Sequence, residues 1–204
     1  MKHYSSLLFL CLCFLGYQTS FAQKALKVPL LPDAGIQPDG NFEEKVWQKA
    51  RKVKLAERTT LYLFQNQDAL FVGIRNEDGA RRYTDAYVHS EAIGTVNLHA
   101  SMQLGERVLH DGWDDSTPAW NWGNNSQWQA NTVKLDEAKD KQLPFSDRLQ
   151  PYHGQEFRID KTKLAPGQVR LRLEVRDFMG EAEAISFPEE STRADVGSWV
   201  SLKL

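Results

Sequence analysis

Apolar and polar residues alternate with a period of two along much of this chain. Every second residue is apolar in the segment 96–104, and apolar residues alternate with charged ones in the segment 169–176. Alternation of this length is typical of antiparallel strands with one face in the core and the other in water. The segment 60–64 is apolar on both faces, which predicts a central strand that forms a hairpin with 70–75. Further strands are expected near residues 85–89, 128–133, 155–159, 182–187 and 198–202.

One short helix is expected near the N-terminus, directly after a Pro-Asp-Gly turn. Asn41 is a candidate N-cap, and Glu44 three residues later completes a capping box. Apolar residues then share one face as far as Ala50, with Trp47 among them as a core residue. Crossover helices of the length that a parallel α/β fold needs are missing from the pattern. We therefore predict an all-β fold, an antiparallel β-sandwich of jelly-roll-like type with one short N-terminal helix.

The segment 1–22 has the pattern of a cleavable signal peptide. A basic start is followed by an apolar stretch over residues 5–16, and Ser20 and Ala22 supply the small residues before cleavage at Gln23. The apolar stretch is shorter than the roughly 20 residues that a membrane span needs. We expect one mature domain over residues 23–204, exported to the periplasm or secreted, with no stable membrane insertion after cleavage. Both cysteines lie in the removed segment, so the core alone must stabilise the domain.

Charge and motifs exclude several classes of function. The formal net charge is −2 at pH 7, and no lysine and arginine cluster marks a basic face, so a nucleic-acid partner is not expected. The sequence has no G-x-S-x-G elbow, no phosphate-binding glycine loop and no cysteine in the mature chain. Glycoside hydrolysis needs two carboxylates facing each other across a cleft, and the sequence alone does not pair them. A glycosidase therefore stays an alternative.

A tryptophan-rich irregular segment, 110–126, offers the best candidate for binding chemistry. Indole rings in a polar loop often mark a binding platform, because exposing them to water is unfavourable without a ligand. A sugar ring suits such a platform, with its C–H face on the aromatic ring and its hydroxyls on amides and carboxylates at the rim. The candidate ligand-binding residues are Trp113, Trp120, Trp122, Asn121, Asn124 and Asp114, with Asn97 and His99 from the predicted strand 95–103. The competing interpretations are a loop pinned by its tryptophans and an ordinary solvated strand face. Trp128 begins a strand, so we interpret it as structural.

No cofactor is expected from the spacing of metal-binding side chains. The histidines show no H-x-x-x-H or H-E-x-x-H pattern. Asp111, Asp114 and Asp115 could supply oxygen atoms to calcium, although the same cluster suits an ordinary turn and matches no defined calcium loop.

Four blocks of the sequence resemble family 9 carbohydrate-binding modules. The segment 36–50, IQPDGNFEEKVWQKA, is similar to the opening of that family, I-x-(x)-D-G-x-(L/F)-x-(D/E)-x-x-W-x-x-A. The segments 68–78, 154–160 and 196–204 resemble its second hairpin strand, its late G-x-E-F-x-I strand and its closing strand. The resemblance implies a β-sandwich and, as the default, sugar binding, often in proteins that act on polysaccharides.

These observations lead to one expected function and two alternatives. We expect a non-catalytic carbohydrate-binding module that recognises a saccharide by aromatic stacking, in support of carbohydrate catabolism. The alternatives are a glycosidase or a glycosidase-associated domain, and an envelope protein that uses the tryptophan-rich loop as a protein-docking patch.

Overall fold

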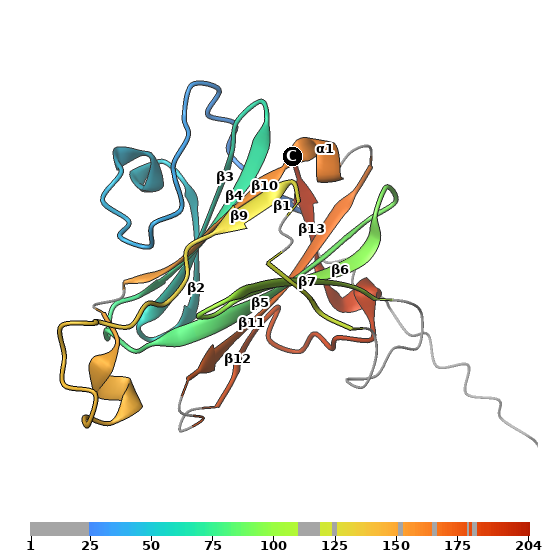
Figure 1. Ribbon diagram of the computed structural model, residues 1–204. Helices are drawn as coiled ribbons and strands as arrows, with labels where there is room; N and C mark the ends of the chain where they lie inside the picture. Colours follow the sequence, from blue (N-terminus) through green and yellow to red (C-terminus); the bar gives the residue numbers. More distant parts are fainter. Residues whose placement is uncertain are drawn as a thin grey trace, which may run out of the picture.

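A computed structural model describes residues 25–109, 119–123, 126–150, 153–164, 167–178, 180 and 183–204 (Figure 1). The predicted signal peptide lies outside these residues, so its cleavage site stays a prediction. Within the described residues, no helix is both long enough and apolar enough to cross a membrane.

The chain folds into two β-sheets that lie face to face (Figure 1). The larger sheet has the strand order β1-β13-β11-β5-β6-β7-β8, with β12 paired to β11, and the smaller has the order β2-β3-β4-β10-β9. The strands of the larger sheet are β1 (Leu26–Lys27), β5 (Arg82–Ser90), β6 (Gly94–Ala100), β7 (Leu104–Leu109), β8 (Asn121–Trp122), β11 (Val169–Asp177), β12 (Ile185–Phe187) and β13 (Val200–Lys203). Those of the smaller sheet are β2 (Arg51–Ala56), β3 (Thr59–Gln65), β4 (Ala69–Asn76), β9 (Trp128–Ala130) and β10 (Gly154–Asp160). Apart from the parallel pair β1–β13, the named strands pair antiparallel, which confirms the predicted all-β sandwich.

The core lies between the sheets and follows the two-residue period. Val96, Leu98 and Ala100 of β6 are buried in it, and so are the odd-numbered residues of β11 from Val169 to Val175. Strand β3 is buried along its whole length between β2 and β4, as its apolar pattern predicts. Trp128 is 1% exposed, which confirms its structural assignment.

A second apolar cluster covers the outer face of the smaller sheet. Phe42 and Trp47 from the N-terminal segment pack there against Tyr62, Phe64 and other buried residues of β3 and β4. A Cβ atom at Gly73 of β4 would lie 2.7 Å from Phe42 Cε1 and 2.9 Å from Trp47 Cη2. Glycine at this position therefore lets both rings lie directly on the strand.

A short helical segment is present near the N-terminus, as predicted, but its extent and its capping differ from the prediction. The segment forms a single 3-10 turn, η1 (Lys45–Gln48), whose N-cap is Glu44 without a side-chain capping bond. Asn41 Oδ1 accepts a hydrogen bond from the Glu43 N–H at 2.8 Å, and Phe42 has φ of 60°. A left-handed residue at this position interrupts any helix that begins at Asn41.

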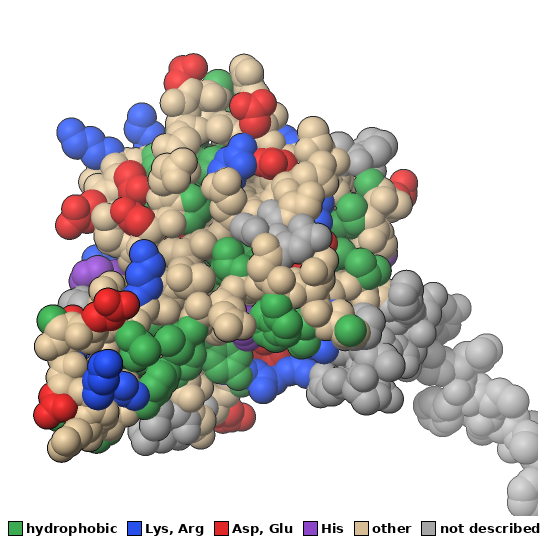
Figure 2. Space-filling model, viewed as in Figure 1, with side chains coloured by type: hydrophobic (Ala, Val, Ile, Leu, Met, Phe, Trp, Pro, Cys, Tyr) green, Lys and Arg blue, Asp and Glu red, His purple; other side chains and the backbone are tan. Residues whose placement is uncertain are grey.

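The single strand expected over 95–104 is two strands joined by a turn. Strand β6 ends at Ala100, and β7 begins at Leu104 after a turn in which the Ser101 N–H donates to the Gln103 carbonyl at 3.0 Å. The described part of the chain contains three further short helices, η2 (Phe145–Arg148), α1 (Lys161–Leu164) and η3 (Val196–Ser198). The segment 134–150 that contains η2 forms the orange lobe in Figure 1, where Leu143 and Phe145 are exposed. Hydrophobic side chains gather beside this lobe in Figure 2.

Candidate functional site

The outer face of the larger sheet carries a row of side chains set by strand register. Trp122 of β8 is opposite Gly105 of β7, Gly105 is opposite His99 of β6, and His99 is opposite Asp85 of β5. Directly paired residues on neighbouring strands point to the same face of a sheet. The structure therefore brings together two predicted site residues, Trp122 and His99, with two residues that the sequence did not single out.

Trp120 and Trp122 form an aromatic platform at one end of this row. Their rings stack with centroids 5.1 Å apart and an interplanar angle of 26°. Trp122 is 50% exposed, whereas Trp120 is partly buried beneath the guanidinium of Arg107, whose Cζ lies 4.3 Å from the ring centroid. The platform therefore leaves a wide indole surface in water, held in place by a neighbouring ring and a cation–π contact.

Gly105 explains why the indole of Trp122 can lie so close to the sheet. A Cβ atom at this position would be 2.7 Å from both Cε3 and Cζ3 of Trp122, and 3.1 Å from Cε3 of Trp120. Carbon atoms normally pack at about 3.5–4.0 Å. Only a residue without a side chain leaves room for the ring on the backbone of β7.

His99 lies beside the platform and is held from two sides. Its Nδ1 is 2.9 Å from Asp85 Oδ1, and its ring centroid is 5.3 Å from that of Trp120 and 5.6 Å from that of Trp122. Tyr83 contacts the imidazole from β5, with ring centroids 5.5 Å apart. The side chains of His99 and Asp85 are only 13% and 11% exposed, so water screens their interaction weakly.

The expectation of a solvated strand face is wrong at Asn97. This residue shares the face with His99, but it is fully buried between Tyr87 and Arg107, its partners on the flanking strands. Among the residues that the structure describes, neither atom of its side-chain amide has a hydrogen-bond partner. Asn97 is therefore not a surface group in this structure, and its role in binding stays a prediction. Asn121 lies between the two platform tryptophans in sequence and is exposed.

The opposite part of this face is closed by an ion network and the C-terminal segment. Glu174 of β11 forms ion pairs with Arg176 at 2.8 Å, Arg193 at 2.7 Å and Arg172 at 3.5 Å. Burial alone would raise the pKa of Glu174, but the bonds and charges of these arginines lower it. Trp199 is 1% exposed and packs on the buried ring of Tyr87.

Three predicted site residues, Trp113, Asp114 and Asn124, lie outside the described residues, and so do the other predicted calcium ligands, Asp111 and Asp115. Nothing in the fold therefore bears on their roles. The calcium hypothesis for this loop stays a prediction.

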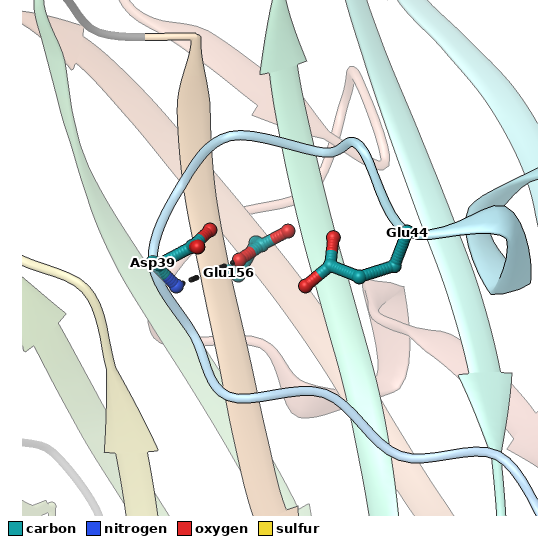
Figure 3. Close-up of side chains that lie close together, drawn as sticks. All are labelled: Asp39, Glu44 and Glu156. Carbon is teal, nitrogen blue, oxygen red and sulfur yellow. Dashed lines mark hydrogen bonds between the residues drawn. The ribbon is translucent and has the colours of Figure 1, made fainter.

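A separate group of carboxyl groups lies on the smaller sheet, where Glu156 of β10 points toward Asp39 and Glu44 (Figure 3). Their oxygen atoms lie within 4.8 Å of one another. Oε2 of Glu156 accepts the backbone N–H groups of Asp39 and Gly40 at 2.9 Å, and Oε1 accepts the indole N–H of Trp47 at 2.9 Å. Burial, together with the neighbouring Glu44 and Asp39, raises the pKa of Glu156. These bonds fasten the N-terminal segment to the sheet, which is a structural role.

Fold and face together define a two-sheet β-sandwich protein with an aromatic platform on the outer face of its larger sheet. No protein-family model matches the chain, and no curated protein sequence matches it. Its fold is similar to a solved structure of a carbohydrate-binding module of family 9 from Caldicellulosiruptor kristjanssonii in complex with cellotriose. The TM-score is 0.51, and the match covers 88% of this chain and 93% of that chain. The two sequences are 11% identical, so the likeness confirms the expected fold.

Proposed function

We propose that this protein is an exported, non-catalytic carbohydrate-binding protein that stacks a saccharide on the indole of Trp122. The observation that supports the proposal best is the 50% exposure of this large ring on the outer sheet face. The similar structure is described as a complex with cellotriose, which makes a saccharide the first ligand to test.

The chemistry of the platform suits a pyranose ring. The exposed indole offers a flat apolar surface to the C–H face of a sugar, and Trp120 and Gly105 fix its orientation before binding. His99 places a polar group at the rim, where ring hydroxyls would lie. A preorganised aromatic ring with a polar rim is a common arrangement for binding a partly apolar ligand.

The size of the effect follows from the exposed indole area. A tryptophan side chain offers about 200 Å², so 50% exposure of Trp122 leaves about 100 Å² in water. A sugar that covers about half of this, with a similar area of its own, gains at most about 2.5 kcal/mol at about 25 cal/mol per Å². Because part of that area is polar, we expect Trp122→Ala to weaken binding by about tenfold, or about 1.4 kcal/mol.

The test is isothermal titration calorimetry with cellotriose, after a glycan array has ranked other oligosaccharides. Phe145→Ala is the matched control, because Phe145 is another exposed aromatic residue, 37% exposed in η2. We expect wild type and Phe145→Ala to bind alike and Trp122→Ala to bind about tenfold more weakly. A wild-type protein that binds no sugar on the array, or a Trp122→Ala variant with unchanged affinity, would refute the proposal.

Export and a place in carbohydrate catabolism belong to the same proposal. The pattern of the segment 1–22 supports export, and mass spectrometry of the protein recovered from a secreting bacterial host should give a chain that begins at Gln23. Capture of polysaccharide fragments outside the cytoplasm would supply substrate to enzymes that degrade them.

A further inference from the structure

The imidazole of His99 is held in a fixed orientation beside the platform. Asp85 Oδ1 lies 2.9 Å from Nδ1, which is hydrogen-bond distance. An ionised aspartate has only acceptor atoms, so the hydrogen of this bond belongs to Nδ1. In the neutral imidazole, Nε2 is then left with a lone pair and acts as an acceptor.

The strand register places the imidazole of His99 between Asp85 and the platform. His99 stands between Asp85 on one neighbouring strand and the row that leads through Gly105 to Trp122 on the other. Nδ1 turns toward Asp85, so Nε2 is the ring nitrogen that stays available to a ligand, on a ring whose centroid lies 5.6 Å from that of Trp122. The perpendicular packing of the ring against Trp122, at 88°, and the contact with Tyr83 restrict its rotation.

We propose that Asp85 is a positioning residue for ligand binding, which orients His99 so that Nε2 accepts a hydrogen bond from a hydroxyl of the sugar stacked on Trp122. This inference rests on the proposed function. It makes the ligand hydroxyl at this position a donor, and it gives a role to the nearly buried carboxylate beside His99.

Two substitutions at Asp85 separate orientation from shape. Asp85→Leu keeps a similar volume but removes the acceptor, so the imidazole is free to carry its hydrogen on Nε2, and cellotriose binding should weaken about five- to tenfold. Asp85→Asn keeps an amide oxygen that can accept from Nδ1, and its binding should stay within about threefold of wild type.

Thr95→Val is the matched control on the same two strands. His89 Nδ1 lies 2.9 Å from Thr95 Oγ1 in a cross-strand pair of the same kind, at the other end of the sheet face. Removing this bond should leave the affinity unchanged. Long-range proton–nitrogen NMR spectra show which ring nitrogen of each histidine carries hydrogen. If Asp85 only stabilised the fold, its substitution would not change this property of His99.

The expected spectra show hydrogen on Nδ1 of His99 in wild type and in Asp85→Asn, and a shift toward Nε2 in Asp85→Leu. Hydrogen on Nε2 in the wild type, or full affinity in Asp85→Leu, would overturn the inference. If Asp85→Leu does not fold, His99→Gln replaces it, and unchanged binding in that variant would have the same consequence. If the wild type binds no saccharide, the proposed function and the proposed contact with the ligand are both refuted. The ring spectra would still show whether Asp85 determines which nitrogen of His99 carries hydrogen.

Discussion

Replacement of Gly105 by alanine tests whether the platform depends on the close approach of Trp122 to β7. The new Cβ atom would lie 2.7 Å from two ring carbons of Trp122, whereas carbon contacts normally lie at about 3.5–4.0 Å. The indole must therefore move outward by about 1 Å. Because half of the ring is already in water, the indole can shift outward without displacing core residues, and we expect the free energy of unfolding to change by less than about 1 kcal/mol.

The effect on binding follows from the displacement. A gap of about 0.5–1 Å removes about a quarter to a half of the attraction between packed atoms. Applied to the stacking energy of at most about 2.5 kcal/mol, this loss is about 0.6–1.2 kcal/mol. We therefore expect Gly105→Ala to bind cellotriose about three- to eightfold more weakly than wild type.

The assay combines calorimetric titration with denaturant unfolding of the same samples. Gly35→Ala is the control, because a Cβ atom there has its nearest neighbour, Asn66 Nδ2, at 4.0 Å. In a Trp122→Ala background the additional effect of Gly105→Ala should disappear, since both changes act on one ring. Unchanged binding in Gly105→Ala, or a loss that persists without Trp122, would show that the close packing of the indole does not determine the affinity.

Two further predictions concern the outer face of the smaller sheet. Gly73→Ala should lower the free energy of unfolding by about 1–3 kcal/mol in denaturant titrations, because Phe42 and Trp47 are buried and cannot move aside as Trp122 can. Glu156→Gln should cost about 1–3 kcal/mol, since an amide nitrogen replaces one of the two oxygens that accept N–H groups, and should lower the melting temperature by about 2–4 °C per kcal/mol. Burial raises the pKa of Glu156 above 4.5, so the folded state binds this proton more tightly than the unfolded state. The wild-type free energy of unfolding should therefore fall as pH rises from 4.5 through the folded-state pKa, and Glu156→Gln should lack this component; an identical pH profile in both proteins would contradict it.

The strands could be predicted because burial on one face imposes a period of two. Strands β6 and β11 follow this pattern, and β3 is recognisable because both of its faces are covered. The same pattern concealed the turn between β6 and β7. Ala100 pairs with Leu104, so both residues face the core and the alternation passes through the turn without a break. A hairpin with this register has the same sequence pattern as one long strand.

The helix could not be predicted correctly, because long-range bonds determine the local conformation. Asn41 and Glu44 have the spacing of a capping box, yet the N–H groups of Asp39 and Gly40 donate to Glu156, more than a hundred residues away in sequence. This anchor, together with the left-handed conformation of Phe42, delays the helical turn until Lys45. Tertiary hydrogen bonds outweigh the small free energy of a single cap.

In the candidate site, some residues could be predicted from the local sequence pattern, and others depend on strand register. The sequence singled out Trp120, Trp122 and His99 because aromatic and polar side chains in a polar segment indicate a binding surface. Gly105 and Asp85 gave no such signal, because an isolated glycine in a strand and an isolated aspartate are both common. Their roles depend on which residues lie opposite them, and that pairing is a property of the folded sheet.

Because the row depends on strand register, the positions of its side chains depend on how the neighbouring strands pair. Asp85, His99, Gly105 and Trp122 occupy one row across four neighbouring strands, and each is placed by the pairing of its own strand. A slip of one residue between any two of these strands would turn a row member toward the core and bring a core residue to the surface. The buried residues between them, such as Leu98 and Val88, therefore fix the register through the free energy of their burial. The same hydrophobic alternation that specifies the fold thus also sets the positions of the glycine beneath the indole and of the histidine at its rim.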